Sequence, residues 1–344
     1  MKKIISLILL FSLLSCSNNY TNFHENKDNF DVNKTEIKEN LSNFSLSNLR
    51  EFESIEISAT PDKKLLKEIV KKIDEAKARI FVEVYIFTEK DLQKALVRAK
   101  KRGIDVKVIM EKNVYKAGNL NKKTSDNFAK NNIETVWASD TNFALTHTKM
   151  MIIDDARIIS TGNYSYSTFS KNREFFIFVK DEKLLGNLLN IFNADFTYKK
   201  EIIYDENLIL SPYYTREKFD ILLKSAKKSI KMYIQNFGDT DILEILKSKQ
   251  KEGIDIEIIM PDLKALPANK EEIVELDKAG IKYKLLKSPY IHAKGILVDD
   301  KYLYLGSVNM SYYSIEKNRE IGLLIKEQKI ISKFNEVFSL DFKK

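Results

Sequence analysis

The chain has 344 residues, 44% of them hydrophobic, which is enough for two domains or one large double domain and excludes a disordered chain. Its single cysteine, Cys16, excludes an intrachain disulfide and a cysteine-based metal site. The formal net charge is +8, and removal of Lys2 and Lys3 with a leader segment would leave 8 − 2 = +6. This modest excess favours anionic partners such as phosphates, nucleic acid or acidic lipid surfaces, although a solvated lysine-rich surface explains it equally well.

The N-terminus predicts export. Residues 1–15 contain two lysines, an apolar run over 4–14 and a small Ser15, a run too short to span a bilayer core of ~30 Å, which needs about 20 residues. The sequence LeuLeuSerCys resembles the bacterial lipobox, in which Cys16 becomes the lipidated first residue; an ordinary signal peptide with an incidental cysteine is the alternative. We therefore expect an exported bacterial lipoprotein, anchored to the extracytoplasmic face of a membrane.

Residues 16–50 are rich in Asn, Ser, Lys and Glu and have no sustained apolar period. Such a composition cannot bury a core, so the segment is expected to be a disordered tether. A flexible chain of this length has a root-mean-square reach of about 30 Å.

The remainder of the chain contains the same order of elements twice, offset by 150 residues. ThrPro at 60–61 and SerPro at 211–212 are each expected to open a helix, with a capping hydroxyl before a proline. The matching segments that follow are strands 80–87 and 230–237, helices 92–101 and 242–251, and strands 104–110 and 254–260. Helices that alternate with apolar strands predict an α/β fold, with two homologous layered lobes at 51–200 and 201–344 related by a pseudo-twofold axis. Glu83, inside the first of these strands, is either a buried polar residue or a strand-edge charge.

Two cassettes with identical spacing carry the chemistry. They consist of His147, Lys149 and Asp154 in the first lobe, and of His292, Lys294 and Asp299 in the second. Residues i and i+2 of an extended segment point to the same side, so the histidine and the lysine of each cassette point toward the same place. A lysine supplies a point charge with three donors and an imidazole can act as nucleophile, base or acid, so the pair suits a phosphate.

Each cassette continues into a predicted hairpin that returns polar residues to the histidine. The apolar strands 150–153 and 295–298 turn back, and four candidate phosphate-binding residues follow: Asn163, Ser165, Ser307 and Asn309. The tyrosines beside the cassettes, among them Tyr166 and Tyr312, are expected to pack rather than to contact substrate.

These residues resemble the phospholipase D superfamily, in which HxKx4D is followed by GSxN. The second copy fits this pattern; the first has seven residues instead of six between Asp154 and Gly162, and its Asn163 and Ser165 stand in reverse order. Each copy ends in AsnArgGlu, and the resemblance implies that Glu174 and Glu320 orient the histidine rings.

The chemistry implied is cleavage of a phosphodiester without metal or cofactor. It needs a nucleophile on phosphorus and an acid on the leaving oxygen, one from each lobe, while the lysines neutralise the phosphoryl oxygens. The resemblance assigns the phosphohistidine to His147 and leaving-group protonation to His292, whereas the residues alone leave this order open. Asp154 and Asp299 are further catalytic candidates, with support of the hairpin turn as their alternative role.

We therefore expect a phospholipase D-type phosphodiesterase, a monomer with two pseudo-symmetric lobes that hydrolyses or transfers phospholipid diesters at a membrane surface. A nuclease of the same superfamily, with nucleic acid as substrate, is one alternative. A non-catalytic phosphate- or lipid-binding lipoprotein is the other. A cardiolipin synthase would share the motifs, but the membrane-spanning N-terminus expected of one is not seen in this sequence.

Overall fold

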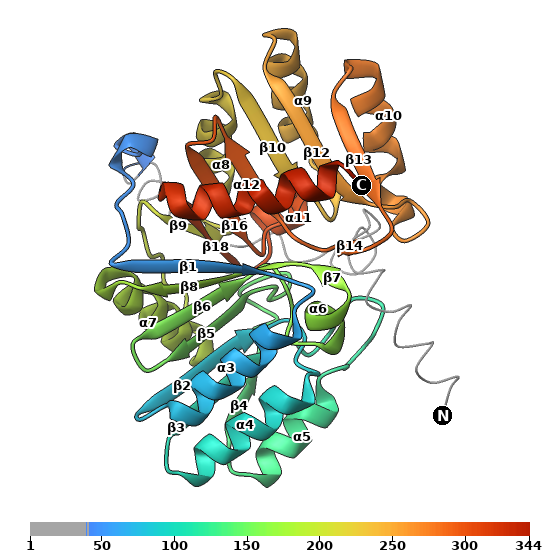
Figure 1. Cartoon of the computed structure of the whole chain (residues 1–344). Helices are drawn as coiled ribbons and strands as arrows, with labels where there is room; N and C mark the ends of the chain where they lie inside the picture. Colours follow the sequence, from blue (N-terminus) through green and yellow to red (C-terminus); the bar gives the residue numbers. More distant parts are fainter. Residues whose placement is uncertain (1–38, 40) are drawn as a thin grey trace.

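The computed structural model describes residue 39 and residues 41–344, and it contains two seven-stranded mixed sheets with the same strand order (Figure 1). The first sheet runs β1 (Ser54–Ala59), β8 (Phe175–Lys180), β6 (Ala156–Ser160), β5 (Lys149–Ile153), β2 (Arg79–Val84), β3 (Asp105–Met110) and β4 (Glu134–Trp137). The second runs β9 (Leu208–Ser211), β18 (Glu320–Ile325), β16 (Tyr302–Gly306), β15 (Gly295–Val298), β10 (Ser229–Tyr233), β12 (Asp255–Pro261) and β13 (Lys282–Leu286). The expected α/β fold with two homologous lobes is confirmed.

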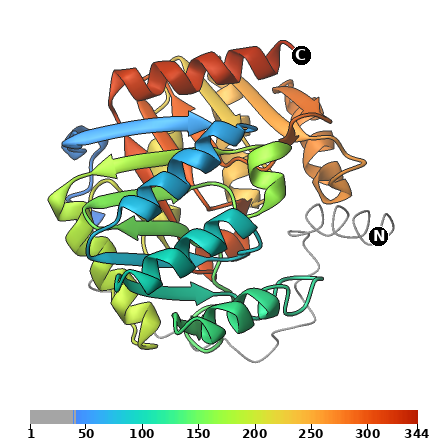
Figure 2. The same ribbon diagram turned by 60° about the horizontal axis from the view of Figure 1, so that its bottom comes forward.

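Helices cover both faces of each sheet. In the first lobe α3 (Lys63–Glu75), α4 (Lys90–Lys101) and α5 (Lys122–Lys130) lie on the outer face, which Figure 2 brings forward. In the second lobe α8 (Thr215–Lys224), α9 (Thr240–Lys251) and α10 (Lys270–Ala279) take the equivalent places. In α3 the apolar residues Leu65, Ile69 and Ile73 recur at helical spacing and are buried, so the periodicity of the sequence sets the inward face.

A third core joins the lobes. It combines the inner faces of both sheets with α7 (Glu182–Phe196) and α12 (Gln328–Phe342), and its residues include Ile159, Ile177, Leu188, Leu303, Leu323, Phe334 and Phe338. Because one apolar core contains residues of both sheets, the two lobes pack as a single unit.

Short strand pairings also connect the two lobes beside the histidine segments. The strand β14 (Tyr290–Ile291) pairs in parallel with β7 (Asn172–Arg173), and the symmetric place is a parallel bridge between Thr146 and Arg319. The pair β11 (Phe237–Gly238) and β17 (Met310–Ser311) lies beside α11 (Tyr312–Glu316), and α6 (Tyr166–Ser170) is the equivalent helix of the first lobe. The 3-10 turns η2 (Leu46–Asn48) and η3 (Pro267–Asn269) complete the regular elements of the described chain.

The predicted helix starts at the two proline pairs are wrong. Helix α3 begins at Lys63 with Asp62 as its cap, and α8 begins at Thr215. The hydroxyl of Thr60 instead donates to the carbonyl of Asn172 at 2.8 Å and accepts from the backbone N–H of Glu174 at 3.0 Å. A tertiary partner thus uses the hydroxyl that local propensity would assign to a helix cap.

The predicted boundary of the tether is also wrong, because residues 41–50, the last part of the predicted tether 16–50, are folded. Phe44, Leu46 and Leu49 are buried against the core of the second lobe. Arg50 forms ion pairs with Asp181 at 3.1 Å and Asp205 at 2.6 Å. The predicted signal peptide at 1–15 and the predicted lipidation site Cys16 lie outside the described residues. Within the described part of the chain, no helix has both the length and the apolar character needed to cross a membrane.

Candidate active site

Each histidine directly follows a short parallel pairing between the two lobes, Thr146 with Arg319 and Ile291 with Arg173. The backbone N–H of His147 donates to the carbonyl of Arg319 at 2.8 Å, and that of His292 donates to the carbonyl of Arg173 at 3.3 Å. Each histidine segment is therefore held by the AsnArgGlu segment of the opposite lobe.

The side chains also pair between the lobes, each histidine with the glutamate of the opposite AsnArgGlu segment. His147 Nδ1 lies 2.8 Å from Glu320 Oε2, and His292 Nδ1 lies 2.8 Å from Glu174 Oε1. The four side chains are at most 4% exposed. A carboxylate on Nδ1 leaves Nε2 of each ring for chemistry, and Nε2 of His147 has no hydrogen-bond partner within the described part of the chain.

Further residues, which the sequence analysis did not identify, hold the two carboxylates. Thr161 donates to Glu174 Oε2 at 2.8 Å and Asn172 donates to Oε1 at 3.1 Å. In the other lobe Ser314 donates to Glu320 Oε1. Asn172 belongs to the repeated AsnArgGlu, so its repetition was a usable signal, whereas nothing local marks Thr161 or Ser314.

Both cassette lysines are fully buried beside the rings. Lys294 Nζ lies 3.2 Å from Nδ1 of His292, and Lys149 Nζ lies over the ring of Tyr85 at 5.4 Å. The two buried ammonium groups offset the charge of the carboxylates on the rings and supply donors that suit the oxygens of a phosphodiester anion.

Burial and the lysines set the protonation of the site. Burial lowers the pKa of His147 well below its usual range, and the charges of Lys149 and Lys294 lower it further. Burial lowers the pKa of His292 to about 4, although Glu174 acts in the raising direction.

The two carboxyl groups differ. Burial acts to raise the pKa of Glu174, but the neighbouring His292 and Lys294 hold it below its usual value. Burial raises the pKa of Glu320 to about 7, against the lowering effect of Lys149. The pair of Glu174 and His292 is therefore the better placed of the two to hold a proton as an imidazolium–carboxylate ion pair.

The predicted phosphate-binding residues need a correction in the first lobe. Ser165 caps α6 by accepting from the N–H of Thr168, and the equivalent position of the second lobe is the cap Ser311. The counterpart of Ser307 is Thr161: the hydroxyl of Thr161 accepts from Phe175 N and that of Ser307 accepts from Ile321 N, at 3.0 and 2.9 Å.

Asn163 and Asn309 then occupy matching places, both buried, and Asn163 Oδ1 has no hydrogen-bond partner among the described residues. The alignment on Gly162 was misleading because the first hairpin is one residue shorter in its turn. With Ser160 aligned to Gly306, the apparent reversal of Asn and Ser disappears, since Ser160 pairs with Phe176 as Gly306 pairs with Gly322.

The catalytic expectation for the two aspartates is contradicted. Asp154 follows the far end of β5, five residues from Lys149 or about 16 Å at the usual strand rise. Its carboxylate accepts from the backbone N–H groups of Lys77, Ala78 and Arg79 at 2.7 to 2.9 Å, at a positive φ of 51°.

Asp299, with a φ of 55°, binds the backbone N–H groups of residues 227–229 in the same way. Both aspartates tie the hairpin turn to the loop before the central strand, which is the alternative role considered from the sequence.

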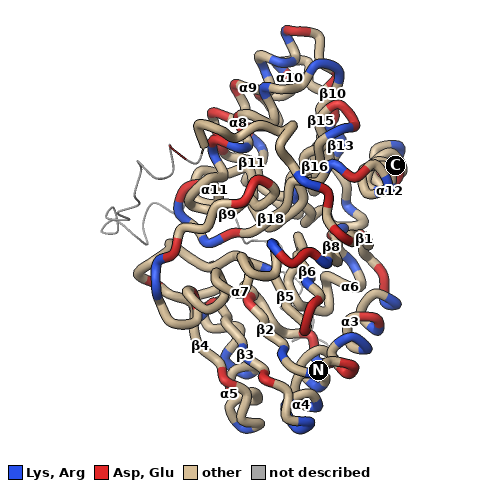
Figure 3. The backbone as a smooth tube through the Cα atoms, turned by 90° about the vertical axis from the view of Figure 1, so that its left-hand side faces the viewer, with Lys and Arg blue, Asp and Glu red and all other residues tan. Residues whose placement is uncertain are grey.

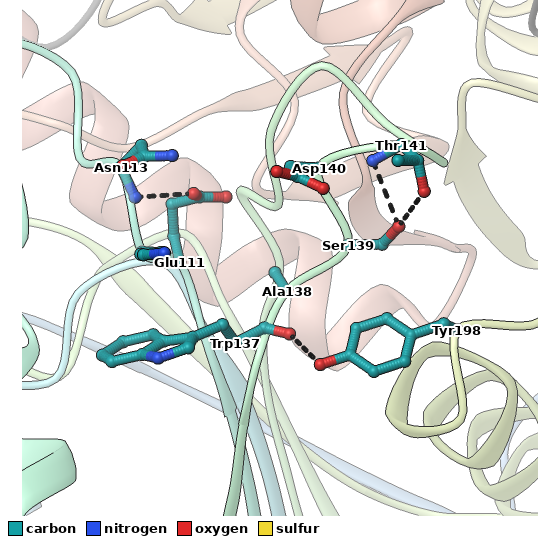
Figure 4. Close-up of a pocket in the computed structure, with 9 residues that line it drawn as sticks. Glu111, Asn113, Trp137, Ala138, Ser139, Asp140, Thr141 and Tyr198 are labelled. Atoms are coloured by element: carbon teal, nitrogen blue, oxygen red, sulfur yellow. Dashed lines mark hydrogen bonds between the residues drawn. The ribbon is translucent and has the colours of Figure 1, made fainter.

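A pocket of about 240 Å³ lies beside the His147 segment (Figure 4). Its lining includes Glu111, Trp137 and Tyr198. The hydroxyl of Tyr198 donates to the carbonyl of Trp137 at 3.1 Å, the contact drawn as a dashed line in Figure 4. Glu111 Oε2 accepts from the backbone N–H of Thr146, the residue before His147, at 2.8 Å. One residue of the pocket lining thus holds the backbone next to His147, whereas the lining includes none of the cassette residues.

The tyrosines beside the cassettes fall into a buried group and an exposed group. Tyr164 is fully buried, as expected for packing, but Tyr166 and Tyr312 are 63% and 51% exposed, which contradicts the expectation that they pack. They are the first residues of α6 and α11, the helices that follow the site residues Asn163 and Asn309.

A family model described as cardiolipin synthase, PLD-like domain, matches residues 69–196 and 220–342. Among similar proteins, cardiolipin synthase 1 of Bacillus anthracis is 24% identical over 329 residues, covering 80% of this chain and 64% of that protein. Cardiolipin synthase of Clostridium perfringens is 23% identical over 338 residues, covering 81% and 68%. The chain thus spans about two thirds of the length of these curated relatives.

Two solved structures share the fold. Phosphatidylserine synthase of Haemophilus influenzae Rd KW20 superimposes with a TM-score of 0.67 at 14% identity, covering 89% of each chain. Polyphosphate kinase of Porphyromonas gingivalis superimposes with a TM-score of 0.64 at 13% identity, covering 85% of this chain and 51% of the kinase.

Proposed function

Because the chain belongs to the family of cardiolipin synthase PLD-like domains, we propose that it transfers the phosphatidyl group of a phospholipid to an alcohol, or to water, through a phosphohistidine. The observation that carries the proposal is the pair of buried His–Glu contacts of 2.8 Å that cross between the lobes. The family match confirms the resemblance to the phospholipase D superfamily. The similarity to cardiolipin synthases, which the N-terminal sequence had argued against, supports our proposal of transfer ahead of hydrolysis.

In the first step we assign the attack on phosphorus to His147 Nε2. Its lowered pKa keeps the ring neutral, as a nucleophile requires. The P–O bond to the leaving alcohol breaks as His292, paired with Glu174, delivers a proton to that oxygen. Lys149 and Lys294 stabilise the charge on the phosphoryl oxygens.

In the second step His292 takes the proton of the incoming alcohol or water, whose oxygen attacks phosphorus. The P–N bond to His147 breaks, and both imidazoles return to their starting state. Burial and the charge of Lys294 disfavour the imidazolium form of His292, and the negative charge of a bound phosphodiester would favour it. Since both halves of the site come from one chain, we propose that a monomer is complete.

The nuclease remains the second candidate, since a nucleic acid is also a phosphodiester. Its support is the positive net charge of the chain. Against it, Figure 3 shows Lys and Arg interspersed with Asp and Glu along the outer helices rather than gathered in a stripe of one sign. A non-catalytic role is disfavoured because both histidines and both lysines are present and held by partners.

The test incubates the purified chain with phosphatidylglycerol vesicles, phosphatidylcholine vesicles and single-stranded DNA in parallel. We expect cardiolipin and glycerol from the first, choline release from the second, and no loss of either in EDTA. The variants His147→Ala and His292→Ala serve as controls for contaminating enzymes. Rapid DNA cleavage without a lipid product, falling about a thousandfold between 50 and 200 mM salt if six phosphates are contacted, would establish the nuclease instead.

We also propose that the chain is an exported bacterial lipoprotein whose acylated Cys16 holds the site near an extracytoplasmic membrane face. The support is the LeuLeuSerCys sequence after an apolar run of residues 4–14. Fractionation of cells that produce the wild type and the Cys16→Ser variant tests this. We expect the wild type in the membrane fraction with an acyl group and the variant released or unprocessed; a soluble, unacylated wild type contradicts the proposal.

A further inference from the structure

A buried charged cluster lies directly behind the His147–Glu320 pair. Arg319 is 1% exposed, and its Nε and Nη2 bind Asp195 of α7 at 2.8 and 3.1 Å. The backbone carbonyl of Arg319 accepts the N–H of His147, and the next residue is Glu320. The position of Arg319 therefore sets the position of both members of the catalytic pair.

The other half of the molecule contains the same device. Arg173 binds Asp341 of α12 at 2.6 and 3.0 Å, and its carbonyl accepts the N–H of His292. A third member, Tyr233 of β10, donates its hydroxyl to Asp341 Oδ2 at 2.8 Å. Asp341 therefore accepts from an arginine and a neutral hydroxyl, and also from the ammonium group of Lys344 at 2.7 Å.

Glu83 occupies the place of Tyr233 in the first lobe. The two residues lie at the same register: Glu83 pairs with Met150 on β5 as Tyr233 pairs with Gly295 on β15. Glu83 is 0% exposed and its side chain interacts with Asp195, as Tyr233 does with Asp341. A carboxyl group thus stands where the second lobe uses a phenol.

The surroundings of Glu83 do not suit a carboxylate ion. Neither of its oxygens accepts a hydrogen bond of good geometry from the described residues, although the hydroxyl of Thr148, which donates to the carbonyl of Arg319 at 3.3 Å, lies near enough to act against the rise in the pKa of Glu83. Asp195 already neutralises Arg319, so a second negative charge would be unpaired, and Glu201 and Tyr213 add no positive charge to this surrounding.

Burial and then the charge of Asp195 raise the pKa of Glu83 well above its usual range, while Arg319 acts in the lowering direction. The missing hydrogen bonds and the raised pKa both favour a protonated, neutral Glu83.

We propose that Glu83 is a positioning residue of the active site, which as a neutral carboxylic acid donates a hydrogen bond to Asp195 and so holds Arg319, Glu320 and His147 in place. With Glu83 neutral, Arg319 and Asp195 form one ion pair with one neutral partner, as Arg173 and Asp341 do with Tyr233, although Asp341 also accepts from Lys344 at 2.7 Å. Each lobe then provides one neutral donor, Glu83 or Tyr233, that holds an aspartate of the same lobe. That aspartate in turn holds the arginine in the AsnArgGlu segment of the opposite lobe.

The kinetic test uses Glu83→Gln and Glu83→Leu, measured on a soluble aryl phosphodiester. Gln keeps a neutral donor, so kcat, KM and the pH–rate profile are expected to stay close to wild type. Leu keeps the volume but removes the donor, so kcat is expected to fall about tenfold or more at little changed KM. Tyr233→Phe, which removes the donor of the other half, is the matched variant, and Glu56→Gln on the exposed edge strand β1 is the surface control.

Loss of activity in Glu83→Gln equal to that in Glu83→Leu overturns the proposal, because an ionised Glu83 would then be needed. Wild-type kinetics in Glu83→Leu also overturns it. This kinetic reading rests on the proposed function, but a second measurement does not.

The infrared difference spectrum between wild type and Glu83→Gln, taken above neutral pH, is expected to show the C=O stretch of a protonated carboxylic acid. Its absence refutes a neutral Glu83, whether or not the protein acts on lipids.

Discussion

Replacing Glu174 by Gln is the sharpest test of how the two lobes share the chemistry. The change keeps the size and one acceptor oxygen of the side chain but removes the charge that faces His292 Nδ1 at 2.8 Å. Thr161 and Asn172 remain able to hold the amide, since the hydroxyl of Thr161 can accept as well as donate. The ring is therefore expected to stay in place while its imidazolium form loses stabilisation.

The size of the effect follows from the contact. Glu174 is fully buried, and a hydrogen bond to a charged group contributes about 1.5–3 kcal/mol. At 1.36 kcal/mol per tenfold change in rate, kcat should fall by about 10- to 150-fold. The loss belongs to the step in which His292 gives its proton to the leaving oxygen.

The assay compares two soluble phosphodiesters, one with a p-nitrophenol leaving group and one with an alkyl alcohol. A nitrophenolate leaves without protonation, so Glu174→Gln should slow phosphohistidine formation from the alkyl substrate more than from the aryl substrate. Glu320→Gln acts on the nucleophile and should slow both alike. Glu182→Gln, at the exposed start of α7, is the control and should change neither.

Two results refute the reasoning. Wild-type rates in Glu174→Gln on both substrates would show that the carboxylate does not assist His292. A leaving-group dependence that appears in Glu320→Gln and not in Glu174→Gln would exchange the roles of the two histidines.

Three further predictions use the same protein. His147→Ala and His292→Ala should each abolish turnover and the double variant should lose little more, because residues that act as a unit are not additive; full activity in either single variant contradicts the site. Asp154→Ala leaves three backbone N–H groups without their acceptor, so the free energy of unfolding in urea should fall by about 2–3 kcal/mol with kcat unchanged, and a hundredfold loss of kcat would restore a catalytic aspartate. Because the unfolded chain binds a proton on His292 near pH 6.5 and the folded chain only near its pKa of about 4, the contribution of His292 to stability should decrease as pH falls through this window, by up to about 3 kcal/mol, while Glu320, whose pKa is raised to about 7, acts in the opposite direction. Urea titrations from about pH 7 to 4 measure this, and a slope unchanged in His292→Gln would show that another group is responsible.

The sequence by itself determined most of the elements and the candidate reacting groups. The alternation of His147 and Lys149 on one side of an extended segment, the apolar strand after them and the hairpin turn are local features, readable within about 15 residues. The repeat of that pattern at His292 also implied two equivalent lobes, since equal patterns of burial require equal layers.

Local signals failed where a tertiary partner competed for the same group. The hydroxyl of Thr60 looked like a helix cap, yet it binds the backbone of Glu174. Asp154 looked like part of the site because of its spacing, but a strand of five residues places it at the opposite end. The reversed Asn and Ser came from aligning Gly162, which the hydrogen bonds of Thr161 correct.

Only the tertiary structure decided which residues meet. Spacing places Glu174 close in sequence to His147, but the packing of the sheets brings it to His292, while Glu320 meets His147. The same packing buries Glu83 near Asp195. From the sequence Glu83 could have been a buried polar residue or a strand-edge charge, and burial favours its neutral form. Such contacts depend on the common core between the lobes, the sum of many weak contacts among residues far apart in the chain, and no short stretch of sequence encodes that sum.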